Sequence, residues 1–273
     1  MSARSGRDAY RAELTALARS DLRLLCLEAD LGGRGHPFAQ EHPERFFNLG
    51  IAEAAMIDMA AALAVAGYRP FVSTFAPFAV LRAAESVKLG MGYLGAGVVL
   101  VAPYAGVSGA WFGTTHHCLE DLAVVQSFPG ITIAAPVGEE EMRAVIRHAA
   151  ASSGPFYVRT GRNAALTSAP FDGDVPPPVN WVSTGPPVVC LVSVGETGTE
   201  LALAAAAQRS VAHAHLCFVD YASLTAAAPE LAARHRRFVV VEEHRPTGGV
   251  ASTLALLLPH REVVGVNAGT AWT

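Results

Sequence analysis

Short apolar runs alternate with longer amphipathic segments along most of the chain. The apolar runs are rich in Val and Leu, as buried strands of a parallel sheet are, and the segments between them have helical periodicity. The pattern therefore predicts an α/β fold. In the first part of the chain we expect strands at 22–29, 70–74, 97–102, 131–135 and 156–159. The helices expected there are 9–20, 52–66, 77–90, 119–128 and 139–151.

A proline-rich segment at 170–187 interrupts this alternation. It holds six of the 17 prolines of the chain, so a helix cannot persist through it. We interpret it as a linker between a first domain at 1–169 and a smaller second domain at 188–273. The alternation then resumes, which predicts two domains that each have a parallel sheet in a three-layer α/β/α arrangement. The strands expected in the second domain are 188–194, 215–220, 238–242 and 263–266, and the helices are 199–208 and 248–258.

The composition limits the classes of protein to which this chain can belong. Hydrophobic residues make up 51% and charged residues 16%, with a formal net charge of -4. This low charge indicates a surface partly covered by another molecule. Asp58, Arg69 and Lys88 interrupt the most apolar region, so no stretch reaches the roughly 18 residues of a membrane span. The N-terminal residues lack the apolar segment of a signal peptide. We expect a cytoplasmic protein with no membrane and no nucleic-acid partner.

Two short motifs lack the context that their chemistry requires. Gly90, Gly92 and Gly95 fit the G-x-G-x-x-G spacing, but a predicted helix precedes them and a predicted strand follows, the reverse of a dinucleotide fold. His213 and His215 lie near a predicted strand without a third convergent ligand. We therefore expect no metal site there.

The most informative motifs lie between residues 45 and 162. They read RFFNLGIAEAAMIDMAAALAVAGYRPFVSTFAPF, then GTTHHCLEDLAVVQSFPGITIAAPVGEEE, then GPFYVRTGR. In order and spacing they resemble the pyrimidine-binding domain of transketolases. The segment VEEHRPTGG at 241–249 is similar to the matching region of the C-terminal domain in that family. The resemblance covers nearly the whole chain and implies an enzyme that uses thiamine diphosphate.

The resemblance assigns Glu53 to the pyrimidine ring of the cofactor. A carboxyl group that shares a proton with N1′ favours the imino tautomer, whose N4′ nitrogen then removes the thiazolium C2 proton. Such a carboxyl group needs a pKa raised by burial. Without the resemblance, Glu53 would be interpreted as a helix-capping residue, since the macrodipole favours a negative charge at a helix start.

The resemblance also assigns side chains around the cofactor ring. Phe75 and Phe78 fall where the family lines the aminopyrimidine pocket with aromatic rings, whereas taken alone they are ordinary core residues. Leu81 stands where the family often has a further aromatic residue, so we expect a thinner pocket wall. Asp30 and Leu31 match an Ala-Asp-Leu turn near the thiazolium ring.

Substrate-contacting residues follow from the same resemblance. His116, in GTTHH, matches an active-site histidine that contacts the ketol oxygens and assists proton movement. Arg162 lies near the position of an arginine that holds the acceptor phosphate, and its planar guanidinium suits that ligand. Arg34, beside a glycine-rich turn, is a second candidate. Both arginines are equally consistent with an ordinary surface.

Two positions depart from the sugar transketolases. Phe112 replaces an aspartate that reads the acceptor hydroxyl, and Tyr104 replaces a histidine. A site without those polar groups discriminates poorly in favour of a polyol. We therefore expect transfer of a two-carbon ketol unit from a ketose-type donor to a less polar acceptor, such as an aromatic aldehyde or a specialised metabolite.

The G-D-G motif that binds magnesium and diphosphate in full transketolases is missing. A diphosphate needs a cation and oriented donors. The resemblance therefore predicts a separate N-terminal, diphosphate-binding subunit that binds most of the Mg²⁺, with an α2β2 heterotetramer as the assembly. The second domain is expected to be shorter than in the family.

Two other functions stay open. The β subunit of a 2-oxoacid dehydrogenase E1 component, or another thiamine diphosphate carboligase, shares this layout, although FVSTFAPF and THH favour a transketolase. A non-catalytic scaffold subunit would explain the lost polar residues. The retained Glu53, Phe75, Phe78 and His116 argue against a scaffold.

Overall fold

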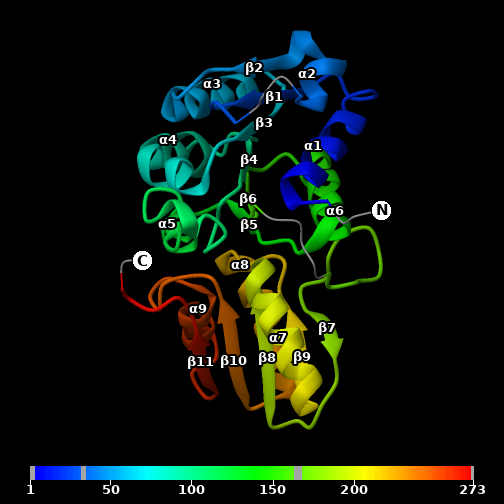
Figure 1. The fold of residues 1–273 in the computed structure, drawn as a ribbon, viewed down its shortest axis with the longest axis vertical. Helices are drawn as coiled ribbons and strands as arrows, with labels where there is room; N and C mark the ends of the chain where they lie inside the picture. Colours follow the sequence, from blue (N-terminus) through cyan, green and yellow to red (C-terminus); the bar gives the residue numbers. More distant parts are fainter. Residues whose placement is uncertain (1–3, 32–34, 163–167, 272–273) are drawn as a thin grey trace.

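A computed structural model describes residues 4–31, 35–162 and 168–271, which form two α/β units (Figure 1). The first unit has a six-stranded parallel sheet with the order β2-β1-β3-β4-β6-β5. Its strands are β1 (Leu24–Glu28), β2 (Phe46–Asn48), β3 (Arg69–Ser73), β4 (Val99–Ala102), β5 (Thr132–Ala134) and β6 (Phe156–Arg159).

Helices cover both faces of this sheet because its strands are apolar on both sides. In β1, Leu24 and Cys26 pack into one core, while Leu25 and Leu27 pack into the other. The first face carries α1 (Gly6–Leu17), α2 (Pro37–Glu41) and α6 (Gly138–Ala151). The second carries α3 (Glu53–Val65), α4 (Ala84–Ser86) and α5 (Asp121–Gln126) (Figure 1). Short 3₁₀ turns, η1 (Pro43–Arg45) and η4 (Ala110–Phe112), complete the unit.

The segment predicted as a helix at 77–90 is helical, but only part of it is an α-helix. Around α4 the chain forms two π-helical segments, η2 (Phe78–Arg82) and η3 (Val87–Tyr93). Ala79, Ala83, Val87 and Met91 recur every four residues along this segment and are all buried, so one side of it packs into the core.

The second unit has a five-stranded sheet with the order β11-β10-β8-β9-β7. Helix α7 packs on one face, and α8 and α9 pack on the other. The strands are β7 (Asn180–Ser183), β8 (Val189–Val194), β9 (Ala212–His215), β10 (Arg237–Glu242) and β11 (Glu262–Val266). The helices are α7 (Gly195–Arg209), α8 (Tyr221–Arg234) and α9 (Val250–Leu257).

The two-domain α/β prediction is confirmed, but the second sheet is mixed rather than wholly parallel. Strand β7 is antiparallel to β9 and lies inside the segment expected to be a linker. Prolines flank it, and only an edge strand tolerates them so close to its hydrogen bonds. The side-chain amide of Asn180 holds β7 in place by donating to the carbonyl groups of Ala169 and Pro170, both at 3.1 Å. The domain limits stay a prediction.

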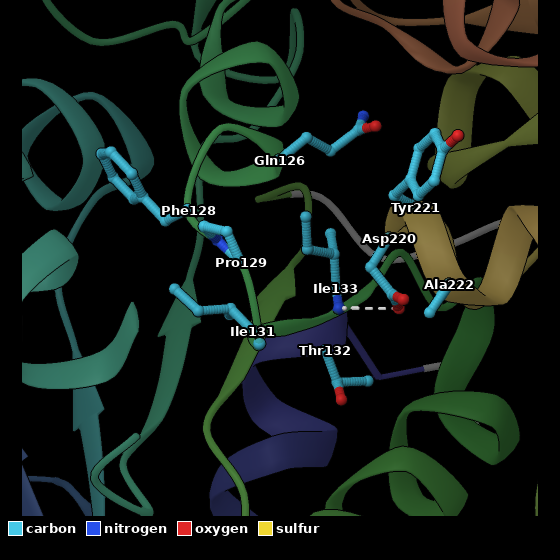
Figure 2. A pocket seen from close by; sticks show the side chains of 10 residues that line it. Gln126, Phe128, Pro129, Ile131, Thr132, Ile133, Asp220, Tyr221 and Ala222 are labelled. Carbon is cyan, nitrogen blue, oxygen red and sulfur yellow. Dashed lines mark hydrogen bonds between the residues drawn. The ribbon is translucent and has the colours of Figure 1, made fainter. Parts of the chain in front are cut away.

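Strand β5 joins the two units through a short antiparallel contact. The N–H of Ala135 donates to the carbonyl of Cys217 at 2.7 Å, and that of Val219 donates to the carbonyl of Ile133 at 2.8 Å. Figure 2 shows Asp220 turned toward the same strand, where its Oδ2 accepts from the N–H of Ile133 at 3.3 Å. No helix among the described residues is long and apolar enough to cross a bilayer.

Candidate functional site

Most of the predicted site residues follow strands that are neighbours in the first sheet. Glu53 comes after β2, Asp30 after β1, Phe75 after β3, Tyr104 after β4 and Arg162 after β6. Carboxyl ends of parallel strands lie at one edge of a sheet, which is where α/β proteins bind ligands. The topology thus brings together residues that are more than one hundred positions apart in sequence.

Glu53 begins α3 and is 2% exposed. The turn before it depends on Asn48, whose side-chain oxygen accepts from the N–H groups of Asp30 at 3.2 Å and Gly50 at 3.0 Å. Gly50 has a φ of +69°, which glycine adopts without strain. Asn48 therefore ties the ends of β1 and β2 together and fixes where α3 starts.

Arg82 contacts Glu53, which the sequence did not reveal. Its Nη1 donates to Glu53 Oε1 at 2.8 Å, and its guanidinium lies over the Phe78 ring, 4.3 Å from the centroid. The Arg82 side chain is 50% exposed, whereas that of Glu53 is buried, so the pair reaches from the interior to the surface.

The predicted aromatic residues form one cluster around His116. The ring centroids of Phe75 and Phe78 lie 5.8 and 5.7 Å from that of His116, and the Phe75 ring is 4.3 Å from Tyr104. Phe112 is closer still, at 4.9 Å from the imidazole. Phe75, Phe78 and His116 are half-buried, so part of each ring remains open to a ligand.

A second aromatic surface continues outward from Tyr104. Trp111 and Phe112 are 55% and 51% exposed, with centroids 5.7 Å apart. The guanidinium of Arg162 lies over the rings of Trp111 and Tyr104, at 4.9 and 5.5 Å from their centroids. Trp111 was not predicted to be a site residue. Its place beside Phe112, in a segment without apolar periodicity, could have indicated it. We call Tyr104, Trp111, Phe112 and Arg162 the aromatic rim.

One backbone conformation and one side-chain contact shape this region. Tyr104 is buried and has a φ of +66°, a conformation that costs a non-glycine residue free energy and is common at binding sites. His116 is oriented by Thr115, whose hydroxyl lies 2.8 Å from the imidazole Nδ1. This contact leaves Nε2 as the ring nitrogen available for a substrate.

The predicted thiazolium-side residues are only partly placed. Asp30 is exposed with a φ of +56°, and the carbonyl of Leu31 accepts from Arg11 Nη2 at 3.0 Å. Arg34, the second candidate for an anion, lies outside the described residues. The cavity of about 290 Å³ in Figure 2 contains none of the predicted residues; it lies between the two units beside Asp220.

A buried cluster of Cys26, Glu28 and His36 offers atoms at metal-ligand spacing, within 4.8 Å of one another. His36 Nδ1 accepts from the N–H of Phe38 at 3.2 Å, so a neutral ring carries its proton on Nε2, 3.0 Å from Glu28 Oε1. That nitrogen has no lone pair to offer a metal. Burial also raises the pKa of the Cys26 thiol, which disfavours the thiolate. With Arg11 3.0 Å from Glu28, the cluster is an ion-pair network rather than a metal site.

Comparison with known proteins agrees with this geometry. The family described as "Transketolase, pyrimidine binding domain" matches residues 2–166. The chain belongs to the transketolase family. It is 30% identical over 269 residues to one of the subunits of an apulose-4-phosphate transketolase from Phocaeicola vulgatus, covering 94% of this chain and 84% of that protein.

Other members of the transketolase family match over different lengths. A 6-deoxy-6-sulfo-D-fructose transketolase subunit, SqwH, of a Clostridium species is 36% identical over 162 residues, or 59% of this chain. The chain spans about half the length of that relative, with 50% covered. A solved structure described as a split gene transketolase, an inactive beta4 tetramer, superimposes with a TM-score of 0.84 and 29% identity, covering 98% of this chain and 89% of the other.

Proposed function

We propose that this chain is the C-terminal subunit of a split transketolase that depends on thiamine diphosphate. The observation that carries the proposal is the buried Glu53 carboxylate, placed at the sheet edge that also holds the rings around His116. The names of the relatives, which include transketolase subunits, support it. The cytoplasmic location expected from the composition is part of the same proposal.

Glu53 and the two phenylalanines fit the aminopyrimidine half of the cofactor. Thiamine diphosphate, when bound, supplies an acidic carbon that adds to a carbonyl group and accepts the electron pair of a broken carbon–carbon bond. Glu53 would hold a proton at N1′ of the pyrimidine, and the half-open faces of Phe75 and Phe78 would orient the ring. His116 Nε2 would move a proton to or from the substrate oxygen.

Arg82 sets a condition for this role of Glu53. Arg82 Nη1 already donates to Glu53 Oε1 at 2.8 Å. N1′ of the pyrimidine needs the same carboxyl group, so we infer that Arg82 moves away from Glu53 when the cofactor binds. Its half-exposed position gives it room to do so.

The acceptor proposed from the sequence is less polar than an aldose phosphate. The aromatic rim supports this, since Tyr104 and Phe112 replace polar residues and Trp111 extends the same surface. Arg162 adds a positive charge over these rings. An acceptor with a flat apolar part and a negative charge fits both features.

The proposed partner is a separate N-terminal subunit that binds the diphosphate and most of the Mg²⁺, in an α2β2 assembly. Helix α3 supports an interface, because its outward side carries Ala55, Met59, Ala62 and Val65, with Asp58 as the one charged residue among them. An outward helix side that is mostly apolar is often covered by another molecule. The relatives named as subunits support the same proposal.

A Glu53→Gln variant in the reconstituted complex tests the function. Glutamine keeps the shape of the side chain but cannot share a proton, so we expect turnover to fall by about 10²- to 10⁴-fold. Cofactor content, measured in parallel, separates lost chemistry from lost binding. Unchanged turnover would rule out the catalytic role, and carbon dioxide release from pyruvate would indicate a 2-oxoacid dehydrogenase component instead.

A further inference from the structure

The loop that carries the predicted substrate-facing residues is closed at its base. We call residues 104–118 the substrate-facing loop; it contains Tyr104, Phe112 and His116. Gly106 and Cys118 pair across its base, with N–H to carbonyl distances of 2.7 and 3.2 Å. Whatever fixes this base also fixes the direction in which the rest of the loop projects.

The second unit holds the start of this loop through Glu243. Its Oε2 accepts from the N–H of Val107 at 3.0 Å, and its Oε1 accepts from the N–H of Thr197 at 2.8 Å. Thr197 lies in the first turn of α7, where free N–H groups and the helix dipole favour a negative charge. One buried carboxylate thus connects the start of α7 to the loop.

The residues after Glu243 hold the other end of the loop. The N–H of Arg245 donates to the carbonyl of Leu119 at 2.9 Å, and its guanidinium donates to Glu120 at 3.0 Å. His244 Nε2 accepts from the N–H of Ala123 at 3.2 Å. Three consecutive residues at the end of β10 therefore contact both sides of the loop base.

These contacts lie where the strand order of the second sheet reverses. The strand order reverses between β8 and β10, and open α/β sheets bind ligands in the crevice at such a point. Here the crevice contains Gly195 and Glu243, and backbone from the first unit at Ala105 and Gly161 closes it to a space of about 10 Å³. A side chain at Gly106, whose φ is +67°, would collide with the Glu243 carboxylate. The loop base occupies the position that a ligand would take.

We propose that Glu243 is a positioning residue, through which the second domain sets the geometry of the substrate-facing loop. That this loop contacts the substrate rests on the proposed function. That Glu243 holds the loop does not depend on the proposed function. The neighbouring Glu242 provides a matched control, because its carboxylate accepts from the N–H groups of Val250 and Ala251, at 2.7 and 3.1 Å, within the second unit.

Hydrogen exchange of the full chain tests the proposal directly. Glu243→Gln keeps the size of the side chain but has one acceptor oxygen and no charge, so it loses one of the two hydrogen bonds and the charge assistance of the other. We expect exchange in residues 105–118 to become about tenfold faster, the effect of one such bond. Glu242→Gln is expected to loosen 249–257 and to leave the loop unchanged. If Glu243→Gln does not fold, Glu243→Asp, which is shorter by one methylene, is expected to give the same local effect.

Fluorescence of Trp111 gives an independent measurement of loop position. In a background with Trp181→Phe and Trp272→Phe, Trp111 is the only tryptophan. Glu243→Gln is expected to increase quenching by acrylamide, and Glu242→Gln is not. Unchanged exchange and quenching in the Glu243 variant, or loosening spread over the whole second unit, would overturn the proposal. Because neither measurement uses turnover, both stand apart from the Glu53→Gln test of function.

Discussion

At the scale of single residues, Glu53 and Arg82 form the pair on which the proposed chemistry depends. The carboxylate is buried, whereas the arginine paired with it is half-exposed. A ligand that hydrogen-bonds Glu53 therefore competes with Arg82 for the carboxylate. The strength of this ion pair therefore affects how tightly the cofactor binds.

Replacing Arg82 is expected to strengthen cofactor binding. In Arg82→Leu no ion pair has to open, and a half-exposed pair of this kind is worth up to about 1 kcal/mol, or roughly fivefold in affinity. Titration of the complex with thiamine diphosphate at fixed Mg²⁺ measures the change. Arg23→Leu, which removes an exposed ion pair with Asp21 at the other end of β1, is the control. Weaker binding in Arg82→Leu would show that the arginine helps to hold the cofactor.

Two buried titratable residues predict opposite pH dependences of stability. Burial lowers the pKa of His213 to about 4, so its neutral form is favoured in the folded state and its contribution is lost as the pH falls from 6.5 toward 4. Burial raises the pKa of Glu196 to about 7, and its contribution is lost as the pH rises from 4.5 through 7. The two effects, each up to about 3 kcal/mol, offset one another in the wild type.

Denaturant unfolding between pH 4 and pH 8 should therefore separate the two variants. Relative to the wild type, Glu196→Gln should gain stability toward pH 8, and His213→Gln should lose less stability toward pH 4. Glu196 also accepts a hydrogen bond from the Thr160 hydroxyl at 3.0 Å, which is a contact between the two units. The stability gained by Glu196→Gln therefore also depends on that contact. Parallel curves for the three proteins would contradict the assigned pKa directions.

At the scale of elements, most of the first unit could be predicted because strands and helices alternate with clear periodicity. Glu53, Phe75 and His116 could also be predicted, since long motifs place them. Arg82 and Glu243 could not, because their roles come from contacts between segments 29 and 136 residues apart. Helix α8 was missed because Pro229 lies inside it, and β7 because prolines surround it.

The outward side of α3 gives an element-scale prediction about assembly. Val65 is 68% exposed in the chain, and a lysine there would place a charge in the proposed interface. We expect Val65→Lys to unfold at the same temperature as the wild type but to lose co-purification with the N-terminal subunit. Leu201→Lys, at a residue 54% exposed on α7 in the second unit, should keep it. Normal association of the Val65 variant would place the interface elsewhere.

At the scale of the whole molecule, the two units contribute differently. The first sheet collects Glu53, the rings around His116 and the aromatic rim at one edge. The second sheet holds the base of the substrate-facing loop at the point where its strand order reverses. The low charge of the sequence fits a chain whose outer helices are covered in an assembly, because the apolar side of α3 has no cover within the described residues.

The central claim is that this chain supplies the pyrimidine half of a shared cofactor site. Calorimetric titration with thiamine diphosphate and Mg²⁺, of the chain alone and of its complex with the N-terminal subunit, tests it most directly. We predict no binding to the chain alone and one cofactor for each copy of the chain in the complex, with affinity reduced in Glu53→Gln. Stoichiometric binding by the chain alone, or none by the complex, would contradict the claim.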